Sequence, residues 1–164
     1  PGRGRVVRPR AFFGVQAMTT DQIRAARAIL RANDRGGYTV PNGRVYPFQW
    51  NWDSAFVALG FDTFDRDRAW AEVDTLFRAQ WPDGFLPHIV FWKEDDGYFP
   101  GPEIWSTGRT PPTSGITQPP VAAMAARWAL ARGGSESEAR CRALYPKLLA
   151  SHRWWAAARD PDGT

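Results

Sequence analysis

Apolar residues recur at helical spacing over most of the chain, and this pattern predicts five helices. Start signals stand at Thr19 and Ser135, each followed three residues later by Gln or Glu, as in a capping box. Stop signals are the glycine pairs that begin at Gly36 and Gly133. The five segments are residues 19–35, 53–62, 65–81, 121–132 and 135–158.

The predicted helices are of two kinds, which indicates two layers. Residues 53–62 and 121–132 are apolar nearly all round, so we expect both helices to be buried on most sides. Residues 65–81 are apolar on one face only, and this helix is expected to lie outside. The alternation predicts an all-α fold with two concentric layers. Because five helices are too few to close such a barrel, a large apolar surface should remain exposed.

Two prolines qualify this helical interpretation. The run 85–92 is the one segment with strand character, and Pro87 interrupts it. Pro146 is expected to kink or restart the last helix, because it removes a hydrogen bond from the helix interior.

Composition and charge exclude several classes of protein. Hydrophobic residues make up 43% and charged residues 23% of the chain, and no apolar run approaches the roughly 20 residues that span a bilayer. The net charge of +4 comes from four arginines within residues 1–14, which we interpret as a basic, flexible segment. We therefore expect neither a nucleic acid nor a membrane as partner. The single cysteine, Cys141, allows no internal disulfide and favours a cytoplasmic setting.

Candidate chemistry lies where the helical pattern breaks. Residues 46–54 combine four aromatic side chains with amide and carboxylate groups, and the long irregular segment 81–118 is rich in Pro and Gly. Five of the nine tryptophans lie in these two segments, at positions 50, 52, 81, 92 and 105. A sugar ring needs an aromatic platform for its C–H face and paired polar groups for its hydroxyls. The two segments therefore predict a carbohydrate site.

Simpler interpretations compete with this one. Each aromatic side chain could pack over a helix end, and Asp53 could be a plain helix N-cap. With only His88 and His152 present, we expect no metal site built on several imidazoles and no metal cofactor. His152 is expected to pack within a helix, and His88 to bond either ligand or backbone. Asp53 and Glu103 form the one local carboxylate pair that could act as acid and base.

Three motifs carry a resemblance to a known family. They are the eleven residues Tyr-Pro-Phe-Gln-Trp-Asn-Trp-Asp-Ser-Ala-Phe at 46–56, Gly-Phe-Leu-Pro-His at 84–88 and Ser-Gly-Ile-Thr-Gln-Pro-Pro at 114–120. Together with the segments 144–148 and 152–155, they resemble the mannosylglycerate and glucosylglycerate hydrolases of glycoside hydrolase family 63. The resemblance covers about residues 15–164, which it identifies as the N-terminal part of a catalytic domain.

The resemblance implies part of an (α/α)6 double-layered barrel that hydrolyses a small α-linked glycoside with inversion and without a cofactor. The family's acidic motifs do not occur in this chain, so we assign no catalytic residue and expect both carboxylates after residue 164. The residues expected to bind substrate are Tyr46, Trp50, Trp52, Asp53, His88, Tyr98 and Gln118.

Other functions stay open at this stage. A carbohydrate-binding module would keep the aromatic pocket without chemistry, and a helical scaffold would bind no ligand. A trehalase-like or glucoamylase-like glucosidase would share the barrel. The sequence leaves the preferred sugar, the aglycone and the oligomeric state undetermined.

Overall fold

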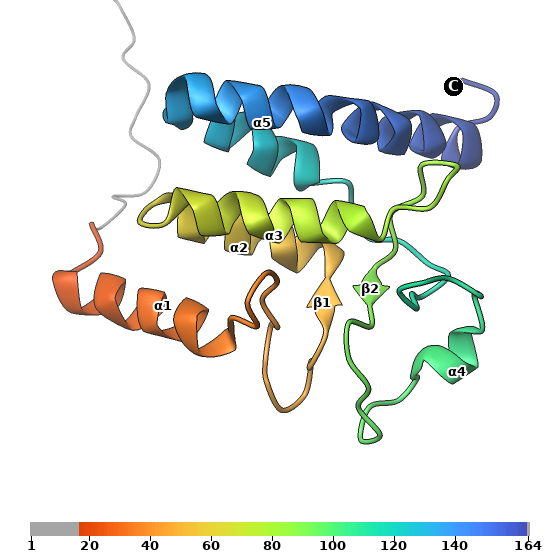
Figure 1. Ribbon diagram of the computed structural model, residues 1–164, viewed down its shortest axis with the longest axis horizontal. Coiled ribbons are helices and arrows are strands. Elements are labelled where there is room, and N and C mark those ends of the chain that lie inside the picture. Colours follow the sequence, from red (N-terminus) through yellow and green to blue (C-terminus); the bar gives the residue numbers. More distant parts are fainter. Residues whose placement is uncertain (1–16, 164) are drawn as a thin grey trace, which may run out of the picture.

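The computed structural model describes residues 17–163, and this part of the chain is mostly helical (Figure 1). The α-helical prediction is therefore confirmed. In chain order the elements are α1 (Thr20–Asn33), β1 (Gln49–Trp50), α2 (Asn51–Asp62), α3 (Arg66–Arg78), β2 (Ile89–Val90), α4 (Pro102–Trp105) and α5 (Ala122–Arg159).

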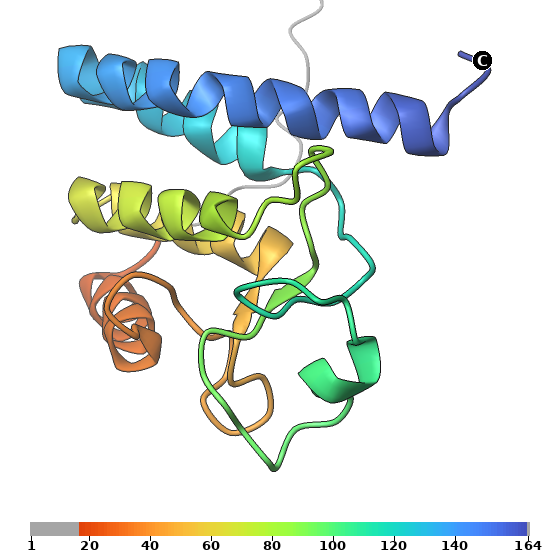
Figure 2. The same cartoon turned by 45° about the vertical axis from the view of Figure 1, so that its right-hand side comes forward.

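Helix α5 consists of two helices joined at a glycine pair. Gly134 has non-helical dihedral angles, with φ of 63° and ψ of −153°, and the two halves of α5 lie side by side (Figures 1 and 2). These angles confirm the predicted break at Gly133-Gly134, and a side chain at Gly133 would overlap Ser137. Pro146 was expected to kink or restart the last helix, and a restart is contradicted, because Gly134 is the only residue inside α5 with non-helical dihedral angles. Pro146 and Arg142, whose carbonyl loses its partner, are both solvent-exposed, so water can replace the missing bond.

The core forms where α3 packs against α2 and both halves of α5. Helix α3 contributes large side chains, with Trp70 and Phe77 each 1% exposed, while α2 and α5 present mainly alanines. Small residues let the helices approach closely around the rings of α3. The indole nitrogen of Trp70 donates to Ser137 Oγ at 3.2 Å, which satisfies the one polar atom of this buried ring.

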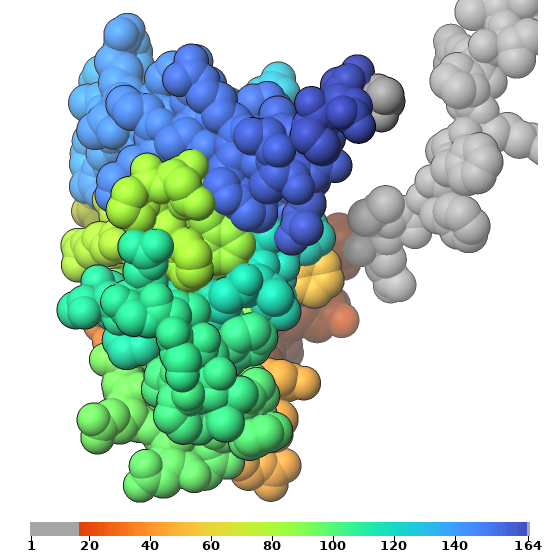
Figure 3. Space-filling model, turned by 90° about the vertical axis from the view of Figure 1, so that its right-hand side faces the viewer, coloured from red at the N-terminus to blue at the C-terminus, as the bar shows by residue number. Residues whose placement is uncertain are grey.

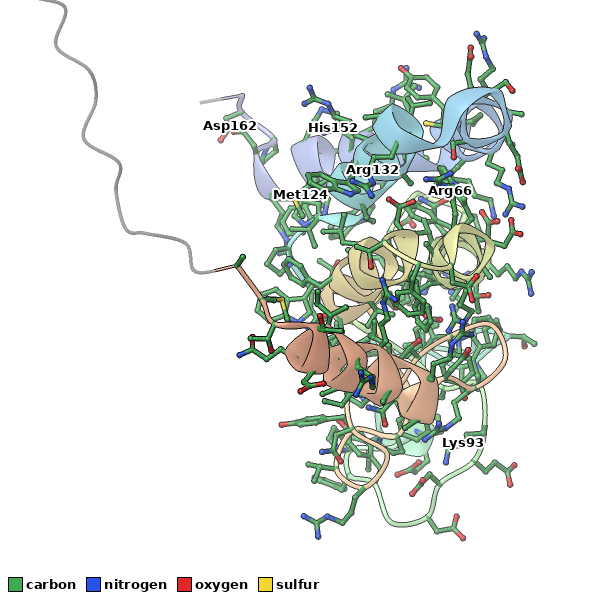
Figure 4. All side chains as sticks on the ribbon, turned by 90° about the vertical axis from the view of Figure 1, so that its left-hand side faces the viewer. Arg66, Lys93, Met124, Arg132, His152 and Asp162 are labelled. Carbon is green, nitrogen blue, oxygen red and sulfur yellow. The ribbon has the colours of Figure 1, made fainter. Side chains whose placement is uncertain are left out.

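Charged side chains at one end of the core tie α2 to its neighbours. Asp62 is 4% exposed and accepts hydrogen bonds from Arg66 Nε at 3.1 Å and Arg132 Nε at 2.9 Å. The two arginines, labelled in Figure 4, come from α3 and α5. One doubly paired carboxylate thus joins the C-terminus of α2 to the start of α3 and to the end of the first half of α5.

Helix α1 lies on the surface and contributes no buried residue. Its N-terminus has the predicted capping box, because Gln22 N–H donates to Thr19 Oγ1 and Thr19 N–H donates to Gln22 Oε1. Leu30 lies against Gly60 of α2, where a side chain would stand 2.9 Å from the leucine methyl group. The absence of a side chain at Gly60 therefore sets how closely α1 approaches α2.

Not every face of the apolar helices is covered. Helix α2 was expected to be buried on most sides, but Trp52 is 43% and Phe56 53% exposed. On α5, Met124 and Trp128 are 46% and 50% exposed. These side chains are the large exposed apolar surface that five helices were expected to leave. Which layer each helix occupies stays a prediction.

A two-stranded sheet lies below the helices and joins the two irregular segments. Antiparallel β1 and β2 pair Gln49 with Val90 and Trp50 with Ile89. Strand β2 falls within the apolar run 85–92 and begins after Pro87, whereas the sequence did not predict β1. In Figure 3 the loop segments around the sheet, coloured green to teal, form the lower part of the molecule beneath α5.

Candidate functional site

A cavity of about 280 Å³ opens at the N-terminus of α2. Its lining consists of Pro41, Tyr46, Trp50, Trp52, Asp53 and Gln118. Five of the seven residues expected from the sequence to bind substrate are therefore brought together, although Gln118 is 65 residues or more from the others. His88 and Tyr98 do not line this cavity.

The two tryptophans of the cavity differ in exposure: Trp50 is buried, and Trp52 is exposed. Trp50 is 6% exposed and packs edge-on against Tyr46 and Tyr98, with ring centroids 5.4 and 5.7 Å away. Trp50 is thus held within an aromatic cluster. Trp52 is 43% exposed, so a large part of its indole is open to a ligand. An exposed indole beside polar groups suits the C–H face of a sugar.

The first turn of α2 is completed by residues from distant loops. Its N-cap is Trp50, which provides no side-chain acceptor. The Asn51 N–H donates to the His88 carbonyl at 3.0 Å, and the Trp52 N–H donates to Gln118 Oε1 at 3.1 Å. Gln118 therefore acts as a capping residue from 66 positions away. Asp53, which could have been the N-cap, lies inside the first turn instead.

The Asp53 carboxyl group lies half-buried at this helix end. Burial raises its pKa, and hydrogen bonds from its own backbone N–H and from the Trp52 side chain oppose that effect. The helix N-terminus also favours a negative charge here. The carboxylate keeps acceptor capacity for further donors, as two neighbouring sugar hydroxyls would supply.

His88 contacts the loop segments around the sheet. Its Nδ1 lies 2.5 Å from Ser114 Oγ, its ring packs edge-on against Trp105, and its backbone N–H donates to the Ile116 carbonyl. Burial lowers the pKa of His88, which favours the neutral ring. In the described residues its clearest role is to join the segments 88–90 and 114–116.

Tyr98 supports the site from behind. Its ring packs edge-on against Phe48 and Trp50 at 5.2 and 5.7 Å. It also lines a second cavity of about 310 Å³ together with Glu103 and other acidic side chains. Asp53 and Glu103 therefore line different cavities, and the structure does not bring this carboxylate pair together.

Sequence reasoning missed the buried polar cluster behind the cavity. Glu72 is 0% exposed and accepts hydrogen bonds from four side chains, those of Thr39, Gln49, Ser54 and Arg68. One signal was available. Glu72 follows Ala69 by three residues and precedes Leu76 by four, so a carboxylate stands on the apolar face of the predicted helix.

Within residues 17–163, no group of three or more His, Cys, Asp or Glu side chains could hold a metal ion. No helix in this described part is long and apolar enough to cross a membrane.

An all-helical fold with an aromatic and carboxylate-bearing cavity at the N-terminus of an apolar helix places the chain in the fold class of the helical-barrel glycoside hydrolases. The chain belongs to the family described as the mannosylglycerate hydrolase MGH1-like glycoside hydrolase domain, which matches residues 46–164. Its fold is part of the all-helical barrel of glycoside hydrolase family 63, as the resemblance implied.

Three similar proteins show how much of the family this chain represents. It is 53% identical to mannosylglycerate hydrolase MGH1 of Selaginella moellendorffii over 150 residues, or 90% of this chain and 31% of the relative. It is 45% identical to glucosylglycerate hydrolase of Mycolicibacterium hassiacum, covering 83% and 34%.

The third is a crystal structure, the family 63 mannosylglycerate hydrolase of Thermus thermophilus with Tris and D-glycerate. It matches with a TM-score of 0.79 and 51% identity, covering 85% of this chain and 34% of that one. The chain thus spans about a third of the length of these relatives.

Proposed function

We propose that this chain forms part of the substrate-binding wall of an inverting, exo-acting glycoside hydrolase. The enzyme releases a hexose from a small α-glycoside such as mannosylglycerate or glucosylglycerate. The observation that carries the proposal is the cavity in which Trp52, Asp53 and Gln118 meet at one helix end. The names of the relatives, mannosylglycerate and glucosylglycerate hydrolase, supply the substrate class.

Each cavity residue has a distinct part in holding the sugar. The open indole of Trp52 takes the C–H face of the ring, and Asp53 accepts hydrogen bonds from two adjacent hydroxyls. Gln118 Oε1 is engaged by the Trp52 backbone, which leaves its amide nitrogen as a donor toward the cavity. A cavity of about 280 Å³ suits a small ligand, in keeping with recognition of one terminal hexose.

The two catalytic carboxyl groups are proposed to come from outside this chain. An inverting glycosidase holds its acid and base roughly 6.5–9.5 Å apart. In the described part of the chain, Asp53 is the one carboxylate that lines the cavity. Asp53 therefore places the sugar, while the acid and base lie beyond residue 164.

The partner and the cellular location of the protein are also proposals. We propose the small glycoside as the substrate partner, with neither nucleic acid nor membrane involved. Cys141 is unpaired, which favours a reducing, cytoplasmic setting. Cell fractionation with an antibody against the protein tests this location.

Hydrolysis by the complete protein that contains this chain tests the proposed function. Mannosylglycerate, glucosylglycerate and trehalose are incubated with it, and free hexose is measured. We expect release from a glycerate conjugate, and we expect Asp53→Ala to lower kcat/KM by about 100-fold, because a misplacement of about 1 Å has that effect.

The matched control for this variant is Asp67→Ala. Asp67 is an exposed carboxylate on α3 that pairs with Arg140, so its loss should leave hydrolysis unchanged. Normal turnover by the Asp53 variant would remove Asp53 from the site. Hydrolysis of trehalose alone would indicate a glucosidase of the same barrel, and sugar binding without any hydrolysis would indicate a binding module.

A further inference from the structure

The strongest unassigned feature is the completely buried carboxylate of Glu72 on α3. Its Oε1 accepts from Ser54 Oγ at 2.7 Å and Gln49 Nε2 at 3.2 Å. Its Oε2 accepts from Thr39 Oγ1 at 2.8 Å and Arg68 Nη2 at 2.9 Å. One side chain therefore joins α3 to the segment before β1, to β1 itself and to α2.

The cluster determines which way the Gln49 amide faces. Gln49 is 0% exposed, and its Nε2 donates to Ser54 Oγ and to the Glu72 carbonyl as well as to the Glu72 carboxylate. With its nitrogen held there, Oε1 faces the opposite way and accepts from Trp92 Nε1 at 2.7 Å. Burial raises the pKa of Glu72, but the Arg68 guanidinium and the Ser54 and Thr39 hydroxyls all stabilise the carboxylate form. A carboxylate held in this way only accepts, so it admits one amide orientation, and that orientation is the one Trp92 needs.

The hydrogen bonds that run from Glu72 through Gln49 to Trp92, here called the relay, adjoin the segment that lines the cavity. Gln49 precedes Trp50, and Ser54 follows Asp53, so two anchors of Glu72 flank the cavity-lining segment. Trp92 lies two residues beyond β2, the strand that pairs with β1. The same hydrogen bonds thus join both irregular segments to α3.

We propose that Glu72 is a positioning residue for the sugar cavity, acting through Gln49 and Ser54 on the segment that carries Trp50 and Asp53. The inference rests on the proposed function of that cavity. A role in stability alone is a poor explanation, because a buried ion pair is often no more stabilising than apolar packing of the same volume. Four converging donors instead give this cluster one arrangement.

Glu72→Gln is the sharpest variant, because it keeps the shape and removes the charge. A carboxamide has one oxygen acceptor in place of two and brings an NH₂ group toward donors. We expect the Gln49 amide to lose its single orientation and Trp92 to lose its acceptor. The dissociation constant of mannose or glucose from the complete protein, measured by tryptophan fluorescence, should rise about tenfold.

Two further variants keep the test independent of folding. Trp92→Phe retains a ring but removes the donor at the end of the relay, and it leaves the pair Glu72–Arg68 intact. It should weaken hexose binding by several-fold. Ser137→Ala is the matched control. It removes the buried hydrogen bond that Trp70 donates to Ser137, and Trp70 lies on α3, as Glu72 does, but takes no part in the relay. It should lower the unfolding temperature and leave hexose affinity unchanged.

A spectroscopic measurement separates positioning from stability. With ¹⁵N-labelled indoles, Glu72→Gln should shift the Trp92 N–H resonance, whereas Ser137→Ala should leave it in place. If folded Glu72→Gln and Trp92→Phe proteins both bind hexose within twofold of the wild type, the positioning role is overturned. An unmoved Trp92 resonance in Glu72→Gln also overturns it.

The failure of this inference is distinguishable from failure of the proposed function. If the wild-type protein neither binds nor releases a hexose, the proposed function fails. The Trp92 resonance still reports whether Glu72 orients Gln49, because that measurement needs no sugar.

Discussion

At the scale of single residues, two opposing effects act on the pKa of Asp53. Burial raises the pKa of this carboxyl group, while hydrogen bonds from its own N–H and from Trp52 act in the other direction. Burial is the larger effect, so the surroundings within the described residues do not fully compensate the charge. Hydroxyl groups of a bound sugar would supply the missing donors, so binding and ionisation should favour each other.

Replacing Asp53 by Asn should separate stability from binding. Since the folded-state pKa of Asp53 lies above its ordinary value, the folded state binds more protons than the unfolded state. The contribution of this group to stability therefore falls as pH rises from that ordinary value through the raised one. As pH rises through this range, the free energy of unfolding of Asp53→Asn should increase relative to that of the wild type. At pH 7 the variant should be no less stable than the wild type.

Denaturant unfolding at several pH values measures this difference. The same variant should bind hexose poorly at pH 7, because an amide offers fewer acceptor sites than a carboxylate. In the wild type, affinity should decline on acidification once Asp53 takes up its proton. A variant that is clearly less stable at pH 7 would show that the carboxylate serves the fold instead.

The candidate site was predictable to the extent that its residues are neighbours in sequence. Trp50, Trp52 and Asp53 stand together before an apolar helix, and their chemistry is readable there. Gln118 came from the family resemblance, since nothing local shows that it completes the first turn of α2. Glu72 was missed because its partners lie up to 33 residues away. A charge on an apolar helix face signals burial without identifying the donors.

At the scale of secondary-structure elements, most local signals led to correct predictions, Pro146 excepted, whereas the strand pairing was not predicted. The capping box at Thr19 and the break at Gly134 are properties of a few adjacent residues, and both are present in the structure. Strand β1 has two residues and exists only because β2 runs beside it. No periodicity develops over so short a strand, so pairing with a distant segment is what defines it.

The turn that leaves α3 provides a test at this scale. Gly84 has φ of 98°, and a side chain there would overlap the Ala150 carbonyl of α5. Gly36 also has a positive φ, of 80°, with no atom within 4 Å of the position of an added side chain. Backbone strain should cost both Ala variants about 1 kcal/mol, while overlap with a helix backbone should add about 1–3 kcal/mol at Gly84 alone.

Thermal or denaturant unfolding of Gly84→Ala and Gly36→Ala measures the difference between the two positions. Gly84→Ala should be the less stable variant by more than the uncertainty of either measurement. Equal losses would mean that the turn can move away from α5 and does not determine how α3 meets that helix.

At the scale of the whole molecule, four of the exposed apolar side chains form two pairs on the apolar helices. Trp52 and Phe56 are four residues apart on α2, and Met124 and Trp128 are four apart on α5, so each pair shares a helix face. The chain spans about a third of the length of its relatives, so we expect the complete protein to cover part of these faces. The helices were predictable from their own residues, whereas nothing in those residues shows what covers the exposed faces.

The chain of 164 residues, prepared alone, should therefore bind an apolar dye more strongly than the complete protein does. Phe56→Glu should reduce dye binding by the isolated chain without lowering its stability, because the ring is 53% exposed there. In the complete protein the same change should cost about 2–5 kcal/mol, as expected for a charge placed in a covered apolar interface.

Met124→Glu, at the residue labelled in Figure 4, offers the same comparison on α5, where the side chain is 46% exposed. Dye fluorescence and unfolding are measured for both lengths of protein. If the face belongs to the barrel interior, the added charge should leave the free energy of unfolding of the isolated chain unchanged and lower that of the complete protein. Equal tolerance in both would mean that α2 and α5 face solvent in the complete protein, and that the barrel closes elsewhere.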